Sequence, residues 1–405
     1  MPAVPLRVLM VVPYFWPAWA YGGIPRLVYG LSRALVERGH EVTVLTTDTL
    51  DREHRIDVRT QDLFGVSVHR LPNLSNRLAY DHQLFLPIGL MQRARELVQR
   101  CDVVHLHGHW HLLNNAAVAA ANRGGQAILM TPNGTLLPHE RKETAKALWD
   151  AALGRRVLDS VHRWLAVSRA EVTQFRAAGI AAEAIDLVHN GLDLAEFEEL
   201  PPRGRFRAAH GIGDRPVVLY LGKLTPRKGV DHLVQAMSRL ADRDAVLVIA
   251  GNDMGVRSAL ERQVRSLELG DRVRFLGLVT GPERLAALTD ADVLVYPSTK
   301  EIFGLVPFEG LLCGTPAVVT DDCGCGELVA EARAGDLVRY GDPHALARAL
   351  DGLLSDPRRR QAMVARGRRF IEKHFAWERI AIQTEAAYRR TLAERAGGTA
   401  AQGER

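Results

Sequence analysis

The sequence predicts an α/β protein made of two doubly wound, Rossmann-like domains in tandem. Short apolar runs alternate with segments of helical period, which is the pattern of parallel strands joined by crossover helices. The alternation lapses around residues 190–215 and then starts afresh. With 405 residues, the chain is also too long for one ordinary hydrophobic core. We therefore expect two domains, with ligand bound at the carboxyl ends of strands that face an interdomain cleft.

The first half of the chain begins with a predicted buried strand in LRVLMVV, residues 6–12. Residues 24–39 are predicted to form a helix, because their apolar side chains recur at helical spacing and Gly39 stands where helices usually end. Further strands are predicted from short apolar runs at residues 41–47, 102–107, 126–131, 163–168 and 184–190. These elements place the N-terminal domain at residues 1–192.

The segment 190–215 is charged and rich in Pro and Gly, which is typical of an interdomain linker. The second series of strands is predicted at residues 217–222, 245–251, 272–277, 292–298, 316–320 and 336–340. Its first helix carries Val230, Leu233, Val234, Met237 and Leu240 on one stripe. The C-terminal domain is thus expected at residues 193–375, and residues 396–405 are expected to be a disordered tail.

Composition limits the class of protein without naming a function. Hydrophobic residues make up 47% and charged residues 24%, as in soluble globular proteins, and the formal charge of +5 suits an anionic ligand, membrane or nucleic acid equally. Four cysteines without a CxxC pair favour neither a disulfide framework nor a zinc site. No run approaches the ~20 apolar residues of a spanning helix, and Arg7 interrupts the one stretch that imitates a signal peptide. We expect a cytoplasmic protein whose membrane contact, if any, is peripheral, and no nucleic-acid partner.

The stretch TKEIFGLVPFEGLLCGTP places two carboxylates, Glu301 and Glu309, in an otherwise apolar run. It follows a predicted strand, so residues 299–304 form a turn and a helix starts near Leu305, whose first amides offer an anion site. Sugar hydroxyls are suitable donors for the two carboxylates. The alternative is that Glu301 faces solvent and that Glu309 pairs with a nearby cation.

A second segment, GKLTPRKGVDHLV, follows another predicted strand and begins a helix. It places Lys223 and Lys228 at a strand's carboxyl end and the adjacent helix start. Two ammonium groups there can neutralise a diphosphate leaving group as its negative charge develops. The alternative is that these cationic side chains are solvated loop residues, and it applies more readily to Arg227 than to the two lysines.

Taken together, these segments resemble the retaining glycosyltransferases of family 4, which have the two-domain GT-B fold. Glu301 to Glu309 matches the E-x7-E motif of that family, and GKL..RKG resembles its GRL..KG phosphate-binding segment, with Lys223 where arginine is usual. The resemblance extends to YGGIPRLVYGLSRALVERGHEVTVLT and the NGLD linker start. It also includes FAWERIAIQTEAAYRR, which is similar to a C-terminal helix, residues 376–395, that returns to the N-terminal domain.

The resemblance implies a role for each matching residue. Glu309 would bind the ribose of the nucleotide, Glu301 the hydroxyls of the donor sugar, and Lys223 and Lys228 the diphosphate. The remaining donor contacts would come from the backbone of Phe303, Gly304, Leu305 and Val306, from the glycine pair Gly22 and Gly23, and from His107, which faces the donor sugar. The glycines do not form a GxGxxG fingerprint, so a nicotinamide cofactor is not expected.

The segment HLHGHWH also allows a metal site, since His105 and His107 would share one face of a strand. A metal-dependent hydrolase centred on these two residues is therefore an alternative function, and a nucleotide-sugar-binding protein without turnover is another. His109 and His111 are interpreted as acceptor-side or loop residues. Asp321 and Asp322 lack the spacing of a DxD metal motif, and Cys323 and Cys325 are either reactive thiols or small turn residues.

The favoured function is transfer of a sugar from a nucleotide-diphosphate donor, such as a UDP- or GDP-sugar, to an acceptor hydroxyl. The resemblance implies retention at the anomeric carbon, no bound metal or other cofactor, and no dedicated base, because the departing diphosphate helps to deprotonate the acceptor. The acceptor would be a sugar or a lipid-linked molecule of polysaccharide, lipopolysaccharide or glycolipid assembly. The amphipathic, cationic segment 139–163 could contact an anionic membrane or be an ordinary solvated helix.

Overall fold

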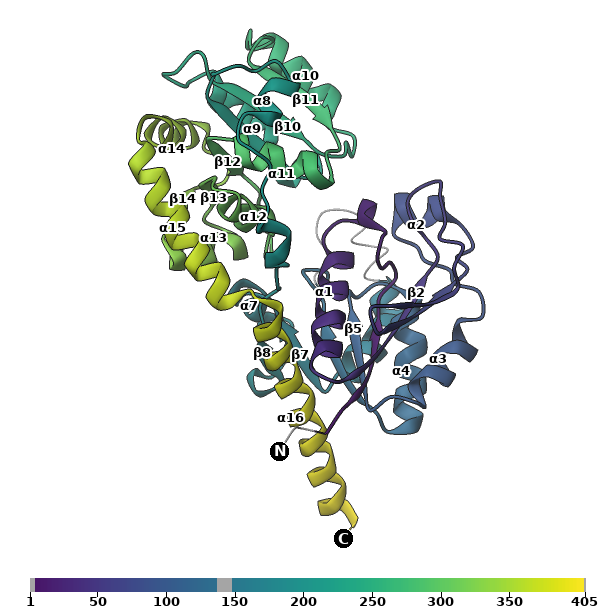
Figure 1. Cartoon of the computed structure of the whole chain (residues 1–405). Helices are drawn as coiled ribbons and strands as arrows, with labels where there is room; N and C mark the ends of the chain where they lie inside the picture. The colour runs from purple at the N-terminus through teal and green to yellow at the C-terminus, as the bar shows by residue number, and fades with distance from the viewer. Residues whose placement is uncertain (1–3, 137–147, 404–405) are drawn as a thin grey trace. The chain divides into compact units, whose positions relative to one another are not determined.

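The computed structural model describes residues 4–136 and 148–403. The chain divides into two compact units (Figure 1). The N-terminal unit comprises the chain up to Leu192 together with the segment from Phe375 onward, and the C-terminal unit comprises Asp193–His374. The two α/β domains expected from the sequence are confirmed.

Within the described residues, the N-terminal unit has one sheet of eight strands in the order β3-β4-β2-β1-β5-β6-β7-β8. The strands are β1 (Arg7–Val11), β2 (Glu41–Thr47), β3 (Thr60–Leu63), β4 (Val66–Leu71), β5 (Val103–His107), β6 (Ala127–Thr131), β7 (Arg163–Ala166) and β8 (Ile185–Leu187). All pairs are parallel except β3 with β4. Strand order reverses between β1 and β5, so the loops after these two strands lie at a topological switch point, where doubly wound folds bind ligands.

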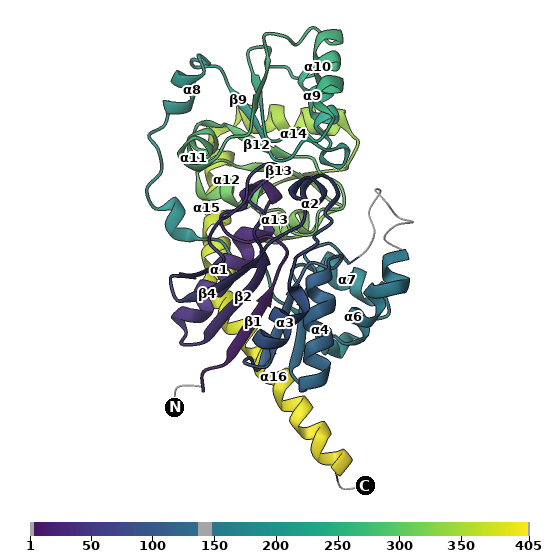
Figure 2. The same ribbon diagram turned by 90° about the vertical axis from the view of Figure 1, so that its right-hand side faces the viewer.

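Helices cover both faces of this sheet. Alternate side chains of β1 enter two separate hydrophobic cores, because successive residues of a strand point to opposite faces. One core contains α1 (Ile24–Glu37) and α16 (Trp377–Gly403), and the other contains α3 (Leu90–Val98) and α4 (Leu112–Gly124). Figure 2 shows α3 and α4 in front of the sheet and α1 behind it. The shorter helices are α2 (Asn76–His82), α6 (Arg155–Asp159) and α7 (Arg169–Ala177).

The C-terminal unit has a fully parallel sheet in the order β11-β10-β9-β12-β13-β14 among the described residues. The strands are β9 (Val217–Leu221), β10 (Val246–Ala250), β11 (Val273–Gly277), β12 (Val293–Tyr296), β13 (Ala317–Thr320) and β14 (Gly335–Val338). The helices are α8 (Arg205–Ala209), α9 (Val230–Met237), α10 (Arg257–Ser266), α11 (Gly281–Asp290), α12 (Val306–Leu312), α13 (Gly324–Ala332), α14 (Pro343–Ser355) and α15 (Pro357–His374). Counted within the unit, this is the 3-2-1-4-5-6 order of dinucleotide-binding folds, with its switch point between β9 and β12.

Three local expectations differ from the structure. The β3–β4 hairpin was not predicted, because β3 is short, mostly exposed and lacks a strong apolar run. The expected linker 190–215 is largely folded onto the C-terminal unit, where the buried Asp290 carboxylate accepts hydrogen bonds from the amides of Gly204, Phe206 and Arg207. A disordered tail was expected at residues 396–405, whereas α16 extends to Gly403 in the structure.

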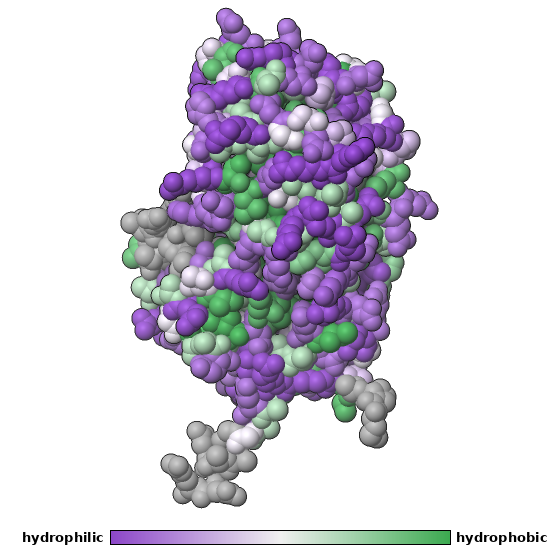
Figure 3. Space-filling model, turned by 90° about the vertical axis from the view of Figure 1, so that its left-hand side faces the viewer, coloured by the Kyte–Doolittle hydropathy of each residue, from purple (hydrophilic) through white to green (hydrophobic). Residues whose placement is uncertain are grey.

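Within the described residues, the structure contains no helix that is long and apolar enough to cross a membrane. The space-filling view of the side on which α15 lies shows mostly hydrophilic side chains, with hydrophobic ones in separate patches (Figure 3).

Candidate functional site

The first candidate site lies at the switch point of the C-terminal unit. The loop after β9 carries Lys223, and the short 3-10 turn Pro226–Lys228 follows it. The loop after the neighbouring strand β12 carries Glu301. The turn requires glycine at position 229, where φ is +62° and a Cβ atom would lie 2.2 Å from the carbonyl oxygen of Pro297. This close approach holds the Lys228 turn against the end of β12.

Lys228, Glu301 and Tyr296 form one hydrogen-bonded cluster. Lys228 Nζ donates to Glu301 Oε2 at 2.5 Å and to the hydroxyl of Tyr296 at 2.6 Å. Burial opposes ionisation of Glu301, but the charge and hydrogen bond of Lys228, the charge of Arg227 and a hydrogen bond with Tyr296 together hold the pKa of this carboxyl below its usual range. Burial raises the pKa of Tyr296 well above its ordinary value, so its phenol stays protonated. The cluster therefore contains an ionised carboxylate and a cation that are both largely withdrawn from water.

Lys223 contributes a second cation to the same region. Burial, followed by the charge of Lys228, lowers the pKa of Lys223 to about 8. The backbone carbonyl of Lys223 accepts a hydrogen bond of 2.8 Å from the hydroxyl of Tyr220, which fixes the loop where it leaves the strand. Two ammonium groups that repel each other favour an anionic ligand between them, since a bound anion would offset the repulsion.

The segment Phe303 to Val306 joins this cluster to α12, as the sequence predicted. Gly304 has φ +69°, and a Cβ atom there would lie 3.1 Å from the ring of Tyr296 and 3.2 Å from Cys325 Cβ. Leu305 is the N-terminal cap of α12, which begins at Val306. Phe303 is buried, with its ring centroid 5.6 Å from that of Phe308. The backbone can therefore approach a ligand at Gly304, where any side chain would be both strained and crowded.

Glu309 pairs with a cation, which was the alternative that the sequence left open. Its Oε2 lies 2.6 Å from Nη1 of Arg284, and both side chains are buried. Nη2 of Arg284 donates to Glu196 Oε1 at 2.5 Å, so one guanidinium bridges two carboxylates. Sequence reasoning missed Arg284, because an arginine in an amphipathic helix carries no signal of its buried partners. The ion pair orients the Glu309 carboxylate within α12 but does not assign a ligand to it.

The switch point of the N-terminal unit carries the remaining predicted residues. Gly22 and Gly23 connect the 3-10 turn Trp19–Tyr21 to α1. Gly22 has φ +108° and so requires glycine, whereas Gly23 has helical dihedral angles and caps α1. His107 is the last residue of β5, at the carboxyl end of the neighbouring strand. The structure therefore places the glycine pair and His107 on adjacent loops of one unit.

His105 and His107 share one face of β5, as predicted, with ring centroids 4.1 Å apart. Both ring nitrogens of His105 have partners at 2.7 Å, Tyr388 and Thr131. Burial lowers the pKa of His105 to about 3 and that of His107 well below its usual value, so both rings are neutral. His105 is thus a structural contact between β5, β6 and α16.

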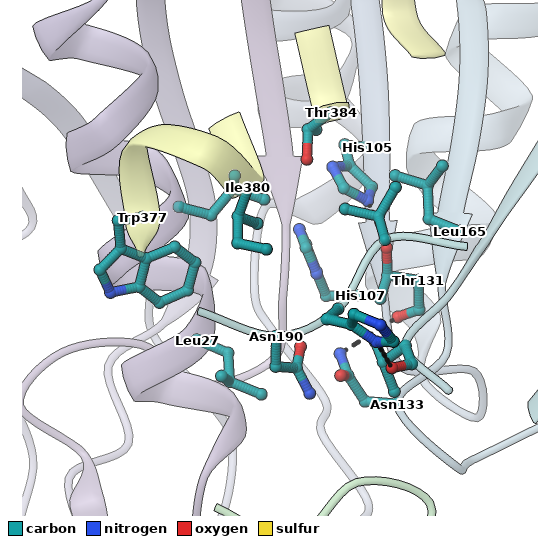
Figure 4. A pocket seen from close by; sticks show the side chains of 14 residues that line it. Leu27, His105, His107, Thr131, Asn133, Leu165, Asn190, Trp377, Ile380 and Thr384 are labelled. Atoms are coloured by element: carbon teal, nitrogen blue, oxygen red, sulfur yellow. Dashed lines mark hydrogen bonds between the residues drawn. The ribbon is translucent and has the colours of Figure 1, made fainter. Parts of the chain in front are cut away.

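A pocket opens beside His107 (Figure 4). His107, Asn133 and Thr384 are among the residues that line it, and Nδ1 of His107, Oδ1 of Asn133 and Oγ1 of Thr384 are buried without a hydrogen-bond partner among the described residues. The other polar side chains at the pocket include His189 and Asn190. Apolar side chains such as Leu27 and Ile380 line the pocket as well.

His109 and His111 fix the loop after β5. His109 Nε2 lies 2.8 Å from Asp150 Oδ1, to which the indole of Trp110 also donates at 3.1 Å. His111 Nε2 lies 3.0 Å from the backbone carbonyl oxygen of His107. Asp150 was not singled out from the sequence, and it begins a π-helical turn, Asp150–Gly154. Residues 139–147 of the predicted amphipathic segment lie outside the described residues.

Among the described residues, no three His, Cys, Asp or Glu side chains converge in a way that could hold a metal ion. The hydrolase alternative is not favoured, since hydrogen bonds already occupy both nitrogens of His105. The carboxylate of Asp322 accepts a hydrogen bond of 2.6 Å from the hydroxyl of Thr299.

Comparisons with known proteins identify the family and the fold of the chain. The model of "Glycosyltransferase Family 4" matches residues 21–196, and that of "Glycosyl transferases group 1" matches residues 202–370. A D-inositol 3-phosphate glycosyltransferase of Kineococcus radiotolerans is 32% identical over 408 residues, covering 93% of this chain and 92% of that protein. An uncharacterized glycosyltransferase of Methanocaldococcus jannaschii is 26% identical, covering 94% of this chain and 97% of the relative.

Solved structures share the fold. Sucrose-phosphate synthase from Thermosynechococcus elongatus aligns with a TM-score of 0.74 at 24% identity, covering 96% of this chain and all of that one. Anabaena HepE in complex with UDP aligns with a TM-score of 0.74 at 19% identity, covering 94% and 99%. Sequence and structure thus agree that the chain belongs to glycosyltransferase family 4, also called glycosyl transferases group 1, and is a transferase with the GT-B fold.

Proposed function

We propose that this enzyme transfers a sugar from a nucleotide-diphosphate donor to an acceptor hydroxyl with retention at the anomeric carbon. The observation that carries the proposal is the cluster of Lys223, Lys228 and Glu301 at the β9/β12 switch point. Two cations and one ionised carboxylate match a donor that has a diphosphate and a hydroxyl-rich sugar. The names of relatives support a sugar nucleotide, since one is a GDP-mannose-dependent mannosyltransferase, 33% identical over 52% of this chain.

In this proposal the lysines stabilise the leaving group. As the bond between the anomeric carbon and the diphosphate breaks, negative charge grows on the diphosphate, and Lys223 and Lys228 lie in a site where water screens their charge little. Glu301 accepts hydrogen bonds from sugar hydroxyls and keeps Lys228 in place by their ion pair. The departing diphosphate oxygen takes the acceptor proton, so the mechanism requires no separate base.

The same charges support a reaction that needs neither a bound metal ion nor another cofactor. Two ammonium groups supply the positive charge that a divalent cation provides in other nucleotide-sugar enzymes. We propose the remaining donor contacts as the sequence indicated: Glu309 for the ribose, the backbone of Phe303–Val306 for phosphate and sugar, and the Gly22–Gly23 loop for the diphosphate. His107 would face the donor sugar through its unpartnered Nδ1.

The proposed acceptor is a sugar or a lipid-linked molecule of polysaccharide, lipopolysaccharide or glycolipid assembly. Peripheral membrane contact through the segment 139–163 is part of this proposal, since within its described part Leu148 is 71% exposed and Arg155 and Arg156 are exposed as well. Sedimentation with anionic and zwitterionic vesicles tests it. Binding to anionic vesicles alone is expected, and binding to neither would refute the membrane contact.

The experiment is a transfer assay with UDP-, GDP- and ADP-sugars in the presence of a chelator. We expect one donor to be used, slow hydrolysis of that donor without acceptor, and an anomeric configuration in the product, read by NMR, that equals that of the donor. Glu301→Gln and Lys228→Ala should abolish transfer while circular dichroism shows an intact fold. Full activity in either variant would refute the assigned roles, and donor binding without any turnover would favour the non-catalytic alternative.

A further inference from the structure

Two thiols lie against the loop that carries Glu301, and the proposed function does not use them. Cys323 and Cys325 are both buried free cysteines, and their Sγ atoms are 3.2 Å apart. A disulfide needs about 2.05 Å between the sulfurs, so a small movement at the start of α13 would join them. Glycine at position 324 stands between them and can follow such a movement with little steric cost.

The surroundings of Cys323 favour its thiolate. Its Sγ accepts a hydrogen bond from the amide of Gly326 at 3.3 Å and caps α13, so it lies at the positive end of the helix dipole. The hydrogen bond from Cys325, with those from Thr320 and Gly326, lowers the pKa of the Cys323 thiol, whereas the same cysteine contact and burial raise the pKa of Cys325. One sulfur is thus suited to attack an oxidant and the other to resolve the product.

This dithiol is joined directly to the donor loop. The amide of Gly324, between the two cysteines, donates to the backbone carbonyl oxygen of Glu301 at 2.7 Å. A Cβ atom on Gly304 would lie 3.2 Å from Cys325 Cβ, so there is no free space between the cysteine turn and the donor loop. A shift of the backbone at the start of α13 would therefore be transmitted to the Glu301 loop.

We propose that Cys323 and Cys325 are a peroxide-sensitive dithiol whose oxidation to a disulfide displaces the loop that carries Glu301. The Cys323 thiolate attacks one oxygen of hydrogen peroxide, which breaks the O–O bond, releases hydroxide and leaves a sulfenic acid on Cys323. The Cys325 sulfur then attacks the Cys323 sulfur, and the hydroxyl leaves as water with the proton of the Cys325 thiol. The hydroxide released in the first step takes up the proton that the Cys323 thiol lost to solvent on ionisation, so two thiols and one peroxide give one disulfide and two waters.

The chain offers internal controls. Cys101 and Cys313 are also buried, and burial raises the pKa of each thiol to about 12, so neither is expected to react. Cys323→Ser removes the reactive thiol but keeps the cap of α13, because serine is a favoured N-terminal cap and its hydroxyl can still accept the hydrogen bond from the Gly326 amide. Cys313→Ser removes a thiol without touching the pair.

The chemical step is tested by mass spectrometry of the full-length protein after peroxide treatment, alkylation and digestion with trypsin. Cleavage after Lys300 and Arg333 gives one peptide with Cys313, Cys323 and Cys325. We expect this peptide to lose two hydrogen atoms, with fragmentation placing the bond between Cys323 and Cys325, in wild type and Cys313→Ser but not in Cys323→Ser. Three alkylated thiols at a peroxide concentration that fully oxidises free cysteine would overturn the proposal.

The coupling to the donor loop is tested without any substrate by hydrogen exchange. Oxidation should speed exchange at residues 299–304 and at Gly324 in wild type, and it should change nothing in Cys323→Ser. Unchanged exchange in a protein that has formed the disulfide would refute the coupling.

The effect on transfer rests on the proposed function. Oxidation is expected to lower transfer by roughly ten- to hundredfold, as a misplacement of about 1 Å does, and dithiothreitol should restore it. Cys323→Ser should transfer as well as reduced wild type and stay active in peroxide. If the reduced protein uses no donor, the proposed function fails. Mass spectrometry and hydrogen exchange would still decide the dithiol proposal, because neither measurement needs a substrate.

Discussion

Replacing Lys223 by arginine should remove a pH dependence of nucleotide binding that the wild-type enzyme shows. Burial and the neighbouring Lys228 lower the pKa of Lys223 to about 8. Such a group is about 90% protonated at pH 7 and about 10% at pH 9. Because only the charged ammonium attracts a diphosphate, the apparent Kd should rise by about tenfold over this range, in proportion to the lost competent fraction. Arginine stays charged throughout, so its binding curve should be flat.

The assay is calorimetric titration with UDP, GDP or ADP, whichever binds, at pH 7, 8 and 9 in a chelator. The ratio of wild-type to Lys223→Arg affinity is the informative quantity, since ionisation of the nucleotide base affects both proteins alike. Binding near pH 8 should also take up a proton, because a diphosphate raises the pKa of Lys223. A flat wild-type profile, or equal slopes in the two proteins, would refute the reasoning.

Four further outcomes are expected. Because the pKa of Lys223 is lower in the folded chain, between about pH 8 and 10.5 the unfolded chain binds a proton that the folded chain has released. The free energy of unfolding should therefore rise over this range in the wild type but not in Lys223→Arg. Gly191→Ala should destabilise the N-terminal unit by about 1–3 kcal/mol in urea unfolding, since its Cβ would lie 2.4 Å from the Trp377 ring. Arg284→Met should cost about 3–5 kcal/mol by the same method, because it leaves two carboxylates without their buried cation. Glu385→Gln should lower the free energy of unfolding by about 2 kcal/mol at pH 7. Burial opposes ionisation of Glu385, but hydrogen bonds from Arg38 and Arg389 help to lower its pKa to about 2, so this loss of stability should persist down to pH 5.

Controls keep these stability predictions specific. Gly270→Ala is a neutral comparison, since no heavy atom lies within 4 Å of the added Cβ and the backbone is not in the left-handed region. A Gly191→Ala protein as stable as Gly270→Ala would show that the Trp377 contact relaxes freely. An Arg284→Met protein of wild-type stability would show that Glu309 and Glu196 find other partners.

The fold was predictable where strands are buried on both faces. All six strands of the C-terminal unit were expected at their observed places, because central parallel strands such as β10 are continuous apolar runs. The β3–β4 hairpin was missed, since an edge hairpin alternates weakly and is mostly exposed. The helical end of α16 was missed because tail composition alone does not show that a packed helix extends into it.

The site was predictable at the level of loops but not of partners. Lys223, Lys228 and Glu301 follow adjacent strands of a doubly wound sheet, so sequence order already brings their loops together. The bond between Lys228 and Tyr296 and the bridge of Arg284 between Glu309 and Glu196 depend on side chains from separate elements. No periodicity encodes such pairs. The roles assigned to the site residues therefore stay predictions until variants are assayed.

The most direct test of the central claim is nucleotide binding to wild type, Lys228→Ala and Arg227→Ala, measured by calorimetry in the presence of a chelator. Both variants lose one positive charge from the same turn, but Lys228 donates hydrogen bonds to Glu301 and Tyr296, whereas Arg227 acts on Glu301 through its charge. The account predicts that one nucleoside diphosphate binds wild type and Arg227→Ala with similar affinity and Lys228→Ala at least about tenfold more weakly, which is 1.4 kcal/mol. Equal binding to all three proteins, or no binding to any, would contradict a donor site at this switch point.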